Sequence, residues 1–424
     1  MLEPYQSTAA GRKRGPKPRP RIDPDDPLLG GKYVAFLQGH LDQLRRAYTH
    51  PNRVVYYDEL VIAYLMAFFH PTVRSLRTLD DLSQVPAMAQ HLSSERLCRS
   101  TLSDANALFD AQLLEPIIEH LRGRVPQLSQ RDPQLAALLK QIVIFDASLF
   151  TVASDVAWAL RQRRPNGQGR ATVRLNLKLD CASGLPEGVI VSGADSSEAD
   201  AATKMIEPGC IYVQDRGYVN FRYIDQLLHA PADLVLRLKS NIGFTVHKEL
   251  PLSDADRAAG VISDRIGRLD GSTDSAAPKA LLREVILLDP DRPDRPVRLL
   301  TSLLDVQHIP AQVVGTIYRQ RWQVELFFRW LKVHAHFEHL ISHSNNGVTL
   351  GFHVAVIAVL LMYLHSGHQP SKYAYNILCW AAAGYGSIEQ LLPILQRRER
   401  ERELERQRLA RKKVAAAASK KPAL

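Results

Sequence analysis

The segment Gly315–Phe337, GTIYRQRWQVELFFRWLKVHAHF, has the pattern of a long helix with one chemically loaded face. Four polar residues on it follow one another at offsets of three, four and seven positions, and at about 100° per residue they project within a roughly 60° arc. They are Tyr318, Arg321, Glu325 and Lys332. Apolar residues beside this face predict that Glu325 lies at the edge of a core. The alternative is a solvated face on which Glu325 simply pairs with an arginine four residues away.

Two upstream segments have the composition of buried strands, and each is followed directly by an aspartate. Gln141–Phe145 (QIVIF) precedes Asp146, and Cys210–Gln214 (CIYVQ) precedes Asp215. Short apolar runs rich in β-branched residues are typical of strands buried on both faces. A carboxylate after such a strand lies at the rim of the sheet, where open α/β sheets bind ligands. Either aspartate alone could be a turn or cap residue, but the two together, with Glu325, favour a shared site.

The segments between and after these strands complete an α/β pattern. Further strand patterns cover Ala171–Leu179, Gly188–Ser192 and Asp233–Lys239, and helices are expected to end near Ile206 and His229. Three strands are thus followed by helix, strand, helix, strand and a long helix, which predicts an α/β domain with a mixed sheet.

Residues 241–304 separate the last of these strands from the Gly315–Phe337 helix. They contain Asp-, Gly- and Pro-rich stretches and two strand patterns, Leu281–Leu288 and Val297–Leu303. We therefore expect a β-rich insertion at 241–304 within an α/β domain that spans residues 139–365.

The regions outside this domain are predicted to be helical or basic. Residues 1–27 have the composition of a disordered, Pro-rich basic tail, and residues 28–138 read as an all-helical domain. In that domain a short helix at Thr78–Ser83 precedes a longer one at Ser103–Arg122, an order found in DNA-reading modules. A bundle that only packs on the next domain or on a second subunit explains the same pattern. Residues 366–424 are expected to form C-terminal helices and a basic tail.

The charge of the chain is concentrated near its ends. The 424 residues carry a formal net charge of +10; residues 11–21 hold six basic residues and no acid, and residues 397–421 have a balance of +7. Such segments suggest a nucleic-acid partner. The four cysteines form no CxxC pair, which argues against a structural zinc site and fits a reducing cytoplasm. The most apolar run, Val354–Leu364, has eleven residues and is too short to cross a bilayer, so no membrane partner is expected.

Asp146, Asp215 and Glu325 would repel one another at one sheet edge unless cations lay between them. Hard oxygen ligands of this kind suit Mg²⁺ or Mn²⁺. Two such ions about 3.5–4 Å apart would stabilise the attacking and leaving oxygens of an in-line phosphoryl transfer. The three carboxylates therefore predict a site for two divalent ions.

These features resemble bacterial insertion-sequence transposases of the DDE type, in the branch that carries the Y-x2-R-x3-E-x6-K signature. Every spacing of that signature is matched by Tyr318, Arg321, Glu325 and Lys332. The strand before Asp146, the DRGY stretch Asp215–Tyr218 and the β-rich insertion add to the resemblance, which covers about residues 140–365.

The resemblance implies a ribonuclease-H-like catalytic domain that cleaves DNA at transposon ends and joins the ends to target DNA. Its catalytic and metal-binding triad would be Asp146, Asp215 and Glu325. The other three signature residues would contact DNA phosphates, which agrees with the bidentate contacts that Arg forms and the point charge that Lys presents. Those residues are Tyr318, Arg321 and Lys332.

Arg237 and Lys239, on the strand before the insertion, are further candidates for DNA contacts, although exposed charges at a strand end explain them as well. Because two DNA ends must be handled together, the resemblance implies a homodimer on DNA and a place in the nucleoid. Two other functions fit the same residues: a stand-alone nuclease on the same fold, and a non-catalytic DNA-binding protein derived from a transposase.

Overall fold

The computed structural model divides into two compact units, Ile118–Tyr375 and a unit formed by Met1–Ile117 with Asn376–Leu424. It describes residues 35–418 apart from several short gaps. The gaps are 49–52, 71, 90–91, 94–95, 126–137, 139–140, 153–159, 164–168, 194–195, 272–276, 290–291, 335–340, 343, 367–370 and 384. The predicted tail at 1–27 lies outside the described residues.

A ten-stranded mixed sheet forms the centre of the Ile118–Tyr375 unit within the described residues, in the order β2-β3-β1-β5-β6-β10-β9-β8-β7, with β4 paired to β3. The strands are β1 (Ile142–Val152), β2 (Leu160–Arg163), β3 (Gly169–Asp180), β4 (Leu185–Gly193), β5 (Ile211–Gln214), β6 (Asp233–Arg237), β7 (Phe244–Glu249), β8 (Val261–Leu269), β9 (Leu282–Asp289) and β10 (Arg292–Thr301). β1, β5 and β6 pair in parallel, whereas β3 is antiparallel to β1 and β10 is antiparallel to β6. The prediction of a mixed α/β sheet is confirmed.

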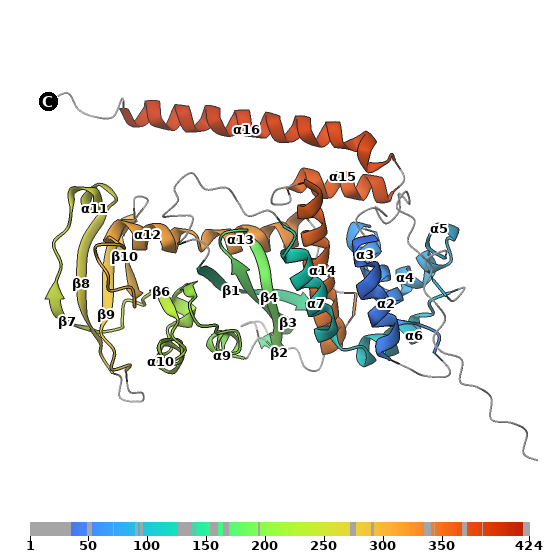
Figure 1. Cartoon of the computed structure of the whole chain (residues 1–424), viewed down its shortest axis with the longest axis horizontal. Coiled ribbons are helices and arrows are strands. Elements are labelled where there is room, and N and C mark those ends of the chain that lie inside the picture. The colour runs from blue at the N-terminus through green and yellow to red at the C-terminus, as the bar shows by residue number, and fades with distance from the viewer. Residues whose placement is uncertain are drawn as a thin grey trace, which may run out of the picture. The chain divides into compact units, whose positions relative to one another are not determined.

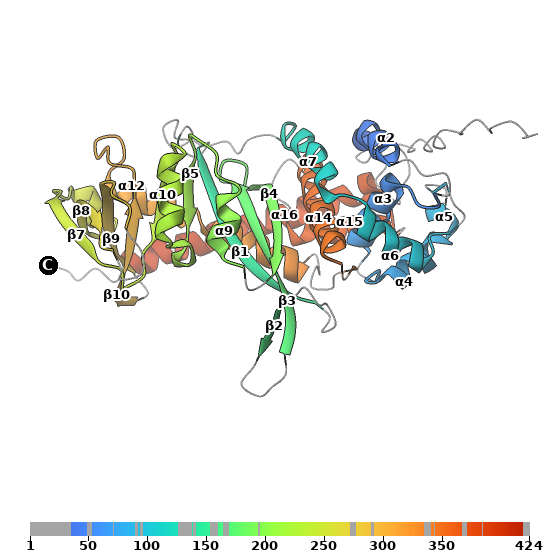
Figure 2. The same ribbon diagram turned by 90° about the horizontal axis from the view of Figure 1, so that it is seen from below.

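β1 is longer than the sequence predicted. We expected the strand to end before Asp146, but it continues to Val152 because β3 pairs with it antiparallel along its whole length. Asp146 therefore lies inside the strand, opposite Leu177 of β3. Figure 2 shows the far end of β3, with β2 beside it, extending beyond the rest of the sheet.

Helices cover both faces of the sheet (Figure 1). They are α9 (Glu198–Thr203), the short 3₁₀ turn η3 (Arg216–Tyr218), α10 (Phe221–His229), α11 (Asp254–Ala258), α12 (Ala311–Arg319), α13 (Trp322–Arg329) and the π-helical turn η4 (Trp330–His334). α9 and α10 pack on one face with a core that includes Phe145, Tyr212 and Leu227. α12 and α13 lie on the opposite face, where their apolar residues Val314 and Val324 are fully buried.

The predicted single helix over Gly315–Phe337 is wrong, because it is divided into α12, α13 and η4. The division falls at Gln320 and Arg321, where tight i to i+3 backbone bonds run from Gln323 N to Gln320 O and from Val324 N to Arg321 O. Gln and Arg are both good helix formers, so their side chains carry no signal for such a break. The 60° arc calculated for one helix consequently does not describe how the four polar residues are arranged.

β7 to β10 extend the same sheet, because β10 pairs directly with β6. A fully buried ion pair holds this part of the fold: Arg283 of β9 donates from Nε and Nη2 to the Asp264 carboxylate of β8, both at 2.7 Å. Arg283 Nη1 also donates to the carbonyl of Ile309 at 2.7 Å, two residues before α12 begins. The start of α12 is thus fixed by the strands that precede it in the chain.

α14 (Asn345–Ser366) is an apolar helix of 22 residues, longer than the eleven-residue run from which we excluded a membrane span. Among the described residues its segment Asn345–Leu364 has the length and composition of a membrane-crossing helix, and 89% of that window is buried inside the fold. The length of α14 therefore does not exclude a membrane span, whereas burial of this extent is typical of a core helix.

The second unit is helical. Its elements within the described residues are η1 (Ala35–Leu37), α2 (Gln38–Ala47), α3 (Tyr57–Phe69), α4 (Leu76–Ser83), α5 (Pro86–Ala89), α6 (Arg99–Leu108), η2 (Ala111–Leu114), most of α15 (Lys372–Ala382) and α16 (Ile388–Ala418). The single helix predicted over Ser103–Arg122 is wrong: α6 ends at Leu108, and η2 and α7 (Glu115–Arg122) follow. Asp110 causes the break, because its side chain accepts the Gln112 amide and caps η2.

Candidate active site

Asp146 and Asp215 are brought together by the register of two parallel strands. Ile144 of β1 pairs with Val213 of β5, and each aspartate lies two residues further along its own strand direction. Neighbouring strands are about 4.8 Å apart, so equal register places Asp146, inside β1, beside Asp215, which follows the end of β5. The charge of Asp215 accordingly acts on the carboxyl of Asp146.

Residues at the α12–α13 junction contact both aspartates. The Tyr318 hydroxyl donates to Asp215 Oδ1 at 3.1 Å. Arg321 donates from Nη1 to Asp146 Oδ2 at 3.2 Å and from Nη2 to Glu325 Oε1 at 2.5 Å. One guanidinium therefore links Asp146 to Glu325, and the helix break turns Arg321 toward the sheet.

Asp146 is the most deeply placed of the three acids, with a side chain only 17% exposed. Burial raises the pKa of Asp146 to about 6, against the opposing effects of a 2.8 Å hydrogen bond from the Ala147 amide and the charge of Arg321. The carboxylates of Glu198 and Asp215 raise the same pKa further. The ionised form of Asp146 is thus destabilised in the folded chain, and a cation bound beside it would stabilise that form.

Arg321 supplies the positive charge between Asp146 and Glu325. Burial by itself lowers the pKa of Arg321, but Tyr318, Glu325 and Asp146 outweigh it and the pKa lies above the ordinary value. Its Nε is buried without a hydrogen-bond partner among the described atoms. Burial, with the charge of Asp215, raises the pKa of Tyr318 to about 12, so the hydroxyl remains a donor at neutral pH.

Lys332 contacts β1 two and three residues beyond Asp146. Its ammonium, in the π-helical turn, donates to Ser148 Oγ at 2.7 Å and to the Leu149 carbonyl at 2.8 Å, and it lies 4.6 Å from the centre of the Phe150 ring. π-Helical turns inside helices are often found at functional sites. Lys332 therefore anchors the π-helical turn to β1 and places a positive charge beside the strand that contains Asp146.

The two further candidates differ. Arg237 Nη1 lies 3.9 Å from Asp215 Oδ1, because β6 is the parallel neighbour of β5. Lys239 has an exposed side chain, and its carbonyl accepts from Arg298; no contact described here joins it to an acid of the site. Arg237 thus belongs to the cluster and Lys239 does not.

The donor chemistry suits a divalent cation, but the present spacing does not form a metal cage. Among the described residues no three His, Cys, Asp or Glu side chains lie close enough to hold one ion. The oxygens that would serve as ligands instead accept from Arg321 and Tyr318. The three carboxylates are the hard donors that Mg²⁺ and Mn²⁺ prefer, and Asp146 is poised to gain from such an ion.

Two residues beside Asp146 were missed from the sequence. Glu198 begins α9, and its carboxylate adds to the raised pKa of Asp146. Tyr218 of η3 is fully buried, and its hydroxyl has no hydrogen-bond partner among the described atoms. The sequence signals available were an acid in the first turn of a helix and the DRGY stretch, and neither indicates closeness to Asp146.

Carboxylates on neighbouring strands of a mixed sheet, interleaved with Arg and Tyr donors, are suited to phosphate-ester chemistry supported by divalent ions. The class of protein is given by residues 137–361, which match the family described as "Transposase DDE domain". This match covers more than half of the chain, so the chain belongs to the DDE transposase family and is a DNA transposase.

Curated relatives agree with this assignment. A putative transposase y4zB of Sinorhizobium fredii is 28% identical over 264 residues, which are 62% of this chain and 69% of the relative. A probable transposase for insertion sequence element IS5377 of Geobacillus stearothermophilus is 25% identical over 228 residues, 53% of this chain and 57% of the relative. A putative transposase for insertion sequence element IS4SA of a Synechocystis strain is 23% identical over 282 residues, 65% and 73% of the two chains.

A solved structure, that of the piggyBac transposase synaptic complex with hairpin DNA, is 12% identical to this chain with a TM-score of 0.40. The alignment covers 84% of this chain and 78% of that one. A TM-score of this size is too low to define a shared fold.

Proposed function

We propose that the chain cleaves DNA at transposon ends and transfers the ends to target DNA by divalent-metal-dependent phosphoryl transfer, with Asp146, Asp215 and Glu325 as metal ligands. The observation that carries this proposal is the meeting of β1, β5 and the α12–α13 junction, where Arg321 links Asp146 to Glu325 and Tyr318 contacts Asp215. The raised pKa of Asp146, due first to burial, supports a ligand role, because a bound cation would favour its ionised form.

The residues of the chain then have separate tasks. When bound, divalent ions of the Mg²⁺ or Mn²⁺ type, two by the proposal, supply Lewis acidity to the attacking and leaving oxygens. Arg321 holds Asp146 and Glu325 until they are needed as ligands, and its second task is a bidentate contact to a DNA phosphate. Tyr318 keeps Asp215 in place as a hydrogen-bond donor, and Lys332 and Arg237 contact the DNA backbone.

The Y-x2-R-x3-E-x6-K spacing supports placement in the branch of DDE transposases that carries this signature. The strand order β4-β3-β1-β5-β6, with β3 antiparallel to its neighbours, supports a ribonuclease-H-like core at 139–365 that carries the insertion 241–304. The helical regions 28–138 and 366–424 then flank the catalytic domain. The chain is proposed to work as a homodimer on DNA, in the nucleoid.

A strand-transfer assay tests the proposal. A duplex with a 3′-hydroxyl at the transposon end is incubated with supercoiled plasmid and Mg²⁺, and joined products are counted. Asp215→Ala should abolish cleavage and joining, whereas Asp225→Ala, which removes a half-exposed carboxylate of α10, should retain both. Retained activity in Asp215→Ala would refute the assignment, and cleavage without joining by the unmodified chain would favour a stand-alone nuclease.

A further inference from the structure

Helix α16, which is largely exposed beyond Leu395, changes its charge pattern along its length. In residues 397–405 arginines alternate with glutamates, and described ion pairs join Arg398 to Glu401 at 3.1 Å and Arg406 to Glu403 at 3.5 Å. After Glu405 no acidic residue occurs in the remainder of the sequence. The first part of the exposed helix is therefore internally neutralised, and the part that follows is not.

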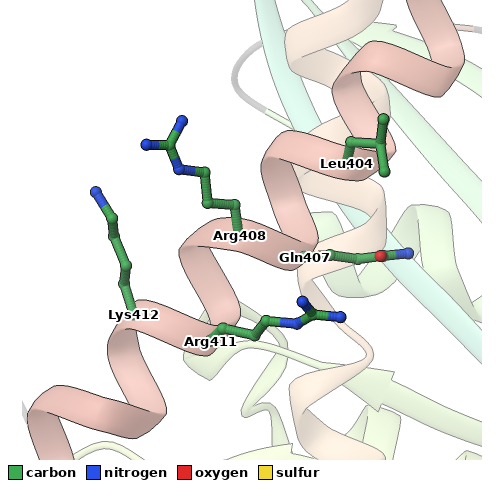
Figure 3. A pocket seen from close by; sticks show the side chains of 5 residues that line it. All are labelled: Leu404, Gln407, Arg408, Arg411 and Lys412. Carbon is green, nitrogen blue, oxygen red and sulfur yellow. The ribbon is translucent and has the colours of Figure 1, made fainter.

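Three cations of the second part share one side of the helix. Arg408, Arg411 and Lys412 follow the i, i+3, i+4 spacing, which confines them to an arc of about 100°. Figure 3 shows Arg408 and Lys412 projecting in the same direction, whereas Arg411 projects to the other side of the helix in this view, near Gln407. All three side chains are exposed, and no ion pair of the described residues involves them. We call these three residues the α16 cation patch.

We propose that the α16 cation patch binds the phosphate backbone of duplex DNA without reading its sequence, as a contact separate from the carboxylate site. This inference rests on the proposed DNA transposition activity. One helical turn places Arg408 and Lys412 about 6 Å apart along the axis, within the reach of their long side chains to neighbouring phosphates. Charge complementarity selects the partner, because unpaired Lys and Arg gain from releasing the counterions that DNA condenses.

The alternating stretch before the patch provides a matched control. A patch variant, Arg408→Ala/Arg411→Ala/Lys412→Ala, and a control variant, Arg398→Ala/Arg400→Ala/Arg402→Ala, remove the same charge from the same exposed helix. Each arginine of the control variant has at least two glutamates within four residues, whereas Arg411 and Lys412 have none and Arg408 has only Glu405. Alanine favours helix at every one of these positions, so α16 should persist in both.

The experiment measures the affinity of the full chain for a short duplex of arbitrary sequence as a function of salt. Each phosphate contact contributes about 0.9 to the slope of log K against log salt, so the patch variant should lose about 2.7. Between about 50 and 200 mM salt the unmodified chain should then lose about 40-fold more affinity than the patch variant. The control variant should keep a slope close to that of the unmodified chain.

The outcomes separate this inference from the proposed function. If the unmodified chain binds DNA with a steep salt dependence and the patch variant keeps the same slope, the α16 contact is refuted while the transposase activity stands. If the patch variant keeps its slope but sediments with a smaller mass, the helix contacts a second copy of the chain, which also refutes the DNA contact. Failure of the unmodified chain to bind any DNA would refute the proposed function itself.

Discussion

Replacement of Asp146 by asparagine should make the metal-free protein more stable at neutral and alkaline pH. Burial raises the pKa of this carboxyl from 3.8 to about 6, so the folded chain binds the proton more tightly than the unfolded chain does. Stability due to this group is therefore full below pH 3.8 and is lost as the pH rises through about 6. A rise of that size corresponds to about 3 kcal/mol once the carboxyl is ionised in both states.

The assay is urea unfolding in the presence of EDTA at a series of pH values. Asp146→Asn should exceed the unmodified chain in unfolding free energy by about 3 kcal/mol at pH 8, and the difference should disappear as the pH approaches about 4. Asp200→Asn, which changes an exposed carboxyl of α9, serves as the control and should show neither effect.

Addition of Mg²⁺ gives a second, independent result. A cation that binds only the folded chain stabilises it by RT ln(1 + [L]/Kd), so Mg²⁺ should raise the stability of the unmodified chain at pH 8 and leave Asp146→Asn almost unchanged. The reasoning would be refuted if Asp146→Asn were less stable than the unmodified chain at pH 8 without metal. In that case the contacts with Arg321 and the Ala147 amide would outweigh the cost of burial.

Three further changes test other parts of the structure. Arg283→Met should lower the unfolding free energy by about 3–5 kcal/mol, because Asp264 stays buried without its partner, and Arg283→Met/Asp264→Leu should recover most of that loss in the same urea titration. Gly267→Ala should lower the unfolding free energy by about 1–3 kcal/mol, because the added carbon would overlap the backbone oxygen of Thr245 on the neighbouring strand. If Gly267→Ala lowered the thermal midpoint no more than an alanine substitution at an exposed position does, the close approach would be contradicted. Lys332→Ala should reduce the salt slope of DNA binding by about 0.9, and an unchanged slope would remove Lys332 from the proposed phosphate contacts.

The strands that were buried on both faces were the easiest to predict. β5 and β6 lie within one or two residues of their expected bounds, and Asn220 caps α10 as its position before an amphipathic run indicates. β7 was missed because most of its residues are exposed and include Lys and His, so hydrophobic periodicity is absent. β8 was missed because its buried positions include Asp264, which reads as a surface residue until its partner is known.

The candidate site could be predicted as a set of residues but not as an arrangement. Acids after apolar strands marked Asp146 and Asp215, and the helix spacing marked Glu325. The contact between Arg321 and Asp146 joins residues 175 positions apart, and local patterns carry no information on such a pair. The role of Arg321 also depends on the break between α12 and α13, which no side chain in the segment signals.

The pairing of Ile144 with Val213 has a consequence for how the chain can change in length. The separation of Asp146 and Asp215 is measured along two hydrogen-bonded backbones and does not depend on the connection between them. Residues inserted in the segments that join β1, β3 and β4 would leave that separation unchanged, because they would lengthen neither β1 before Asp146 nor β5. A single residue inserted between Ile144 and Asp146 would instead turn the carboxyl to the other face of the sheet, because side chains alternate with a period of two. Insertion scanning of this transposase should therefore find tolerant connections a few residues away from positions that tolerate no change of length.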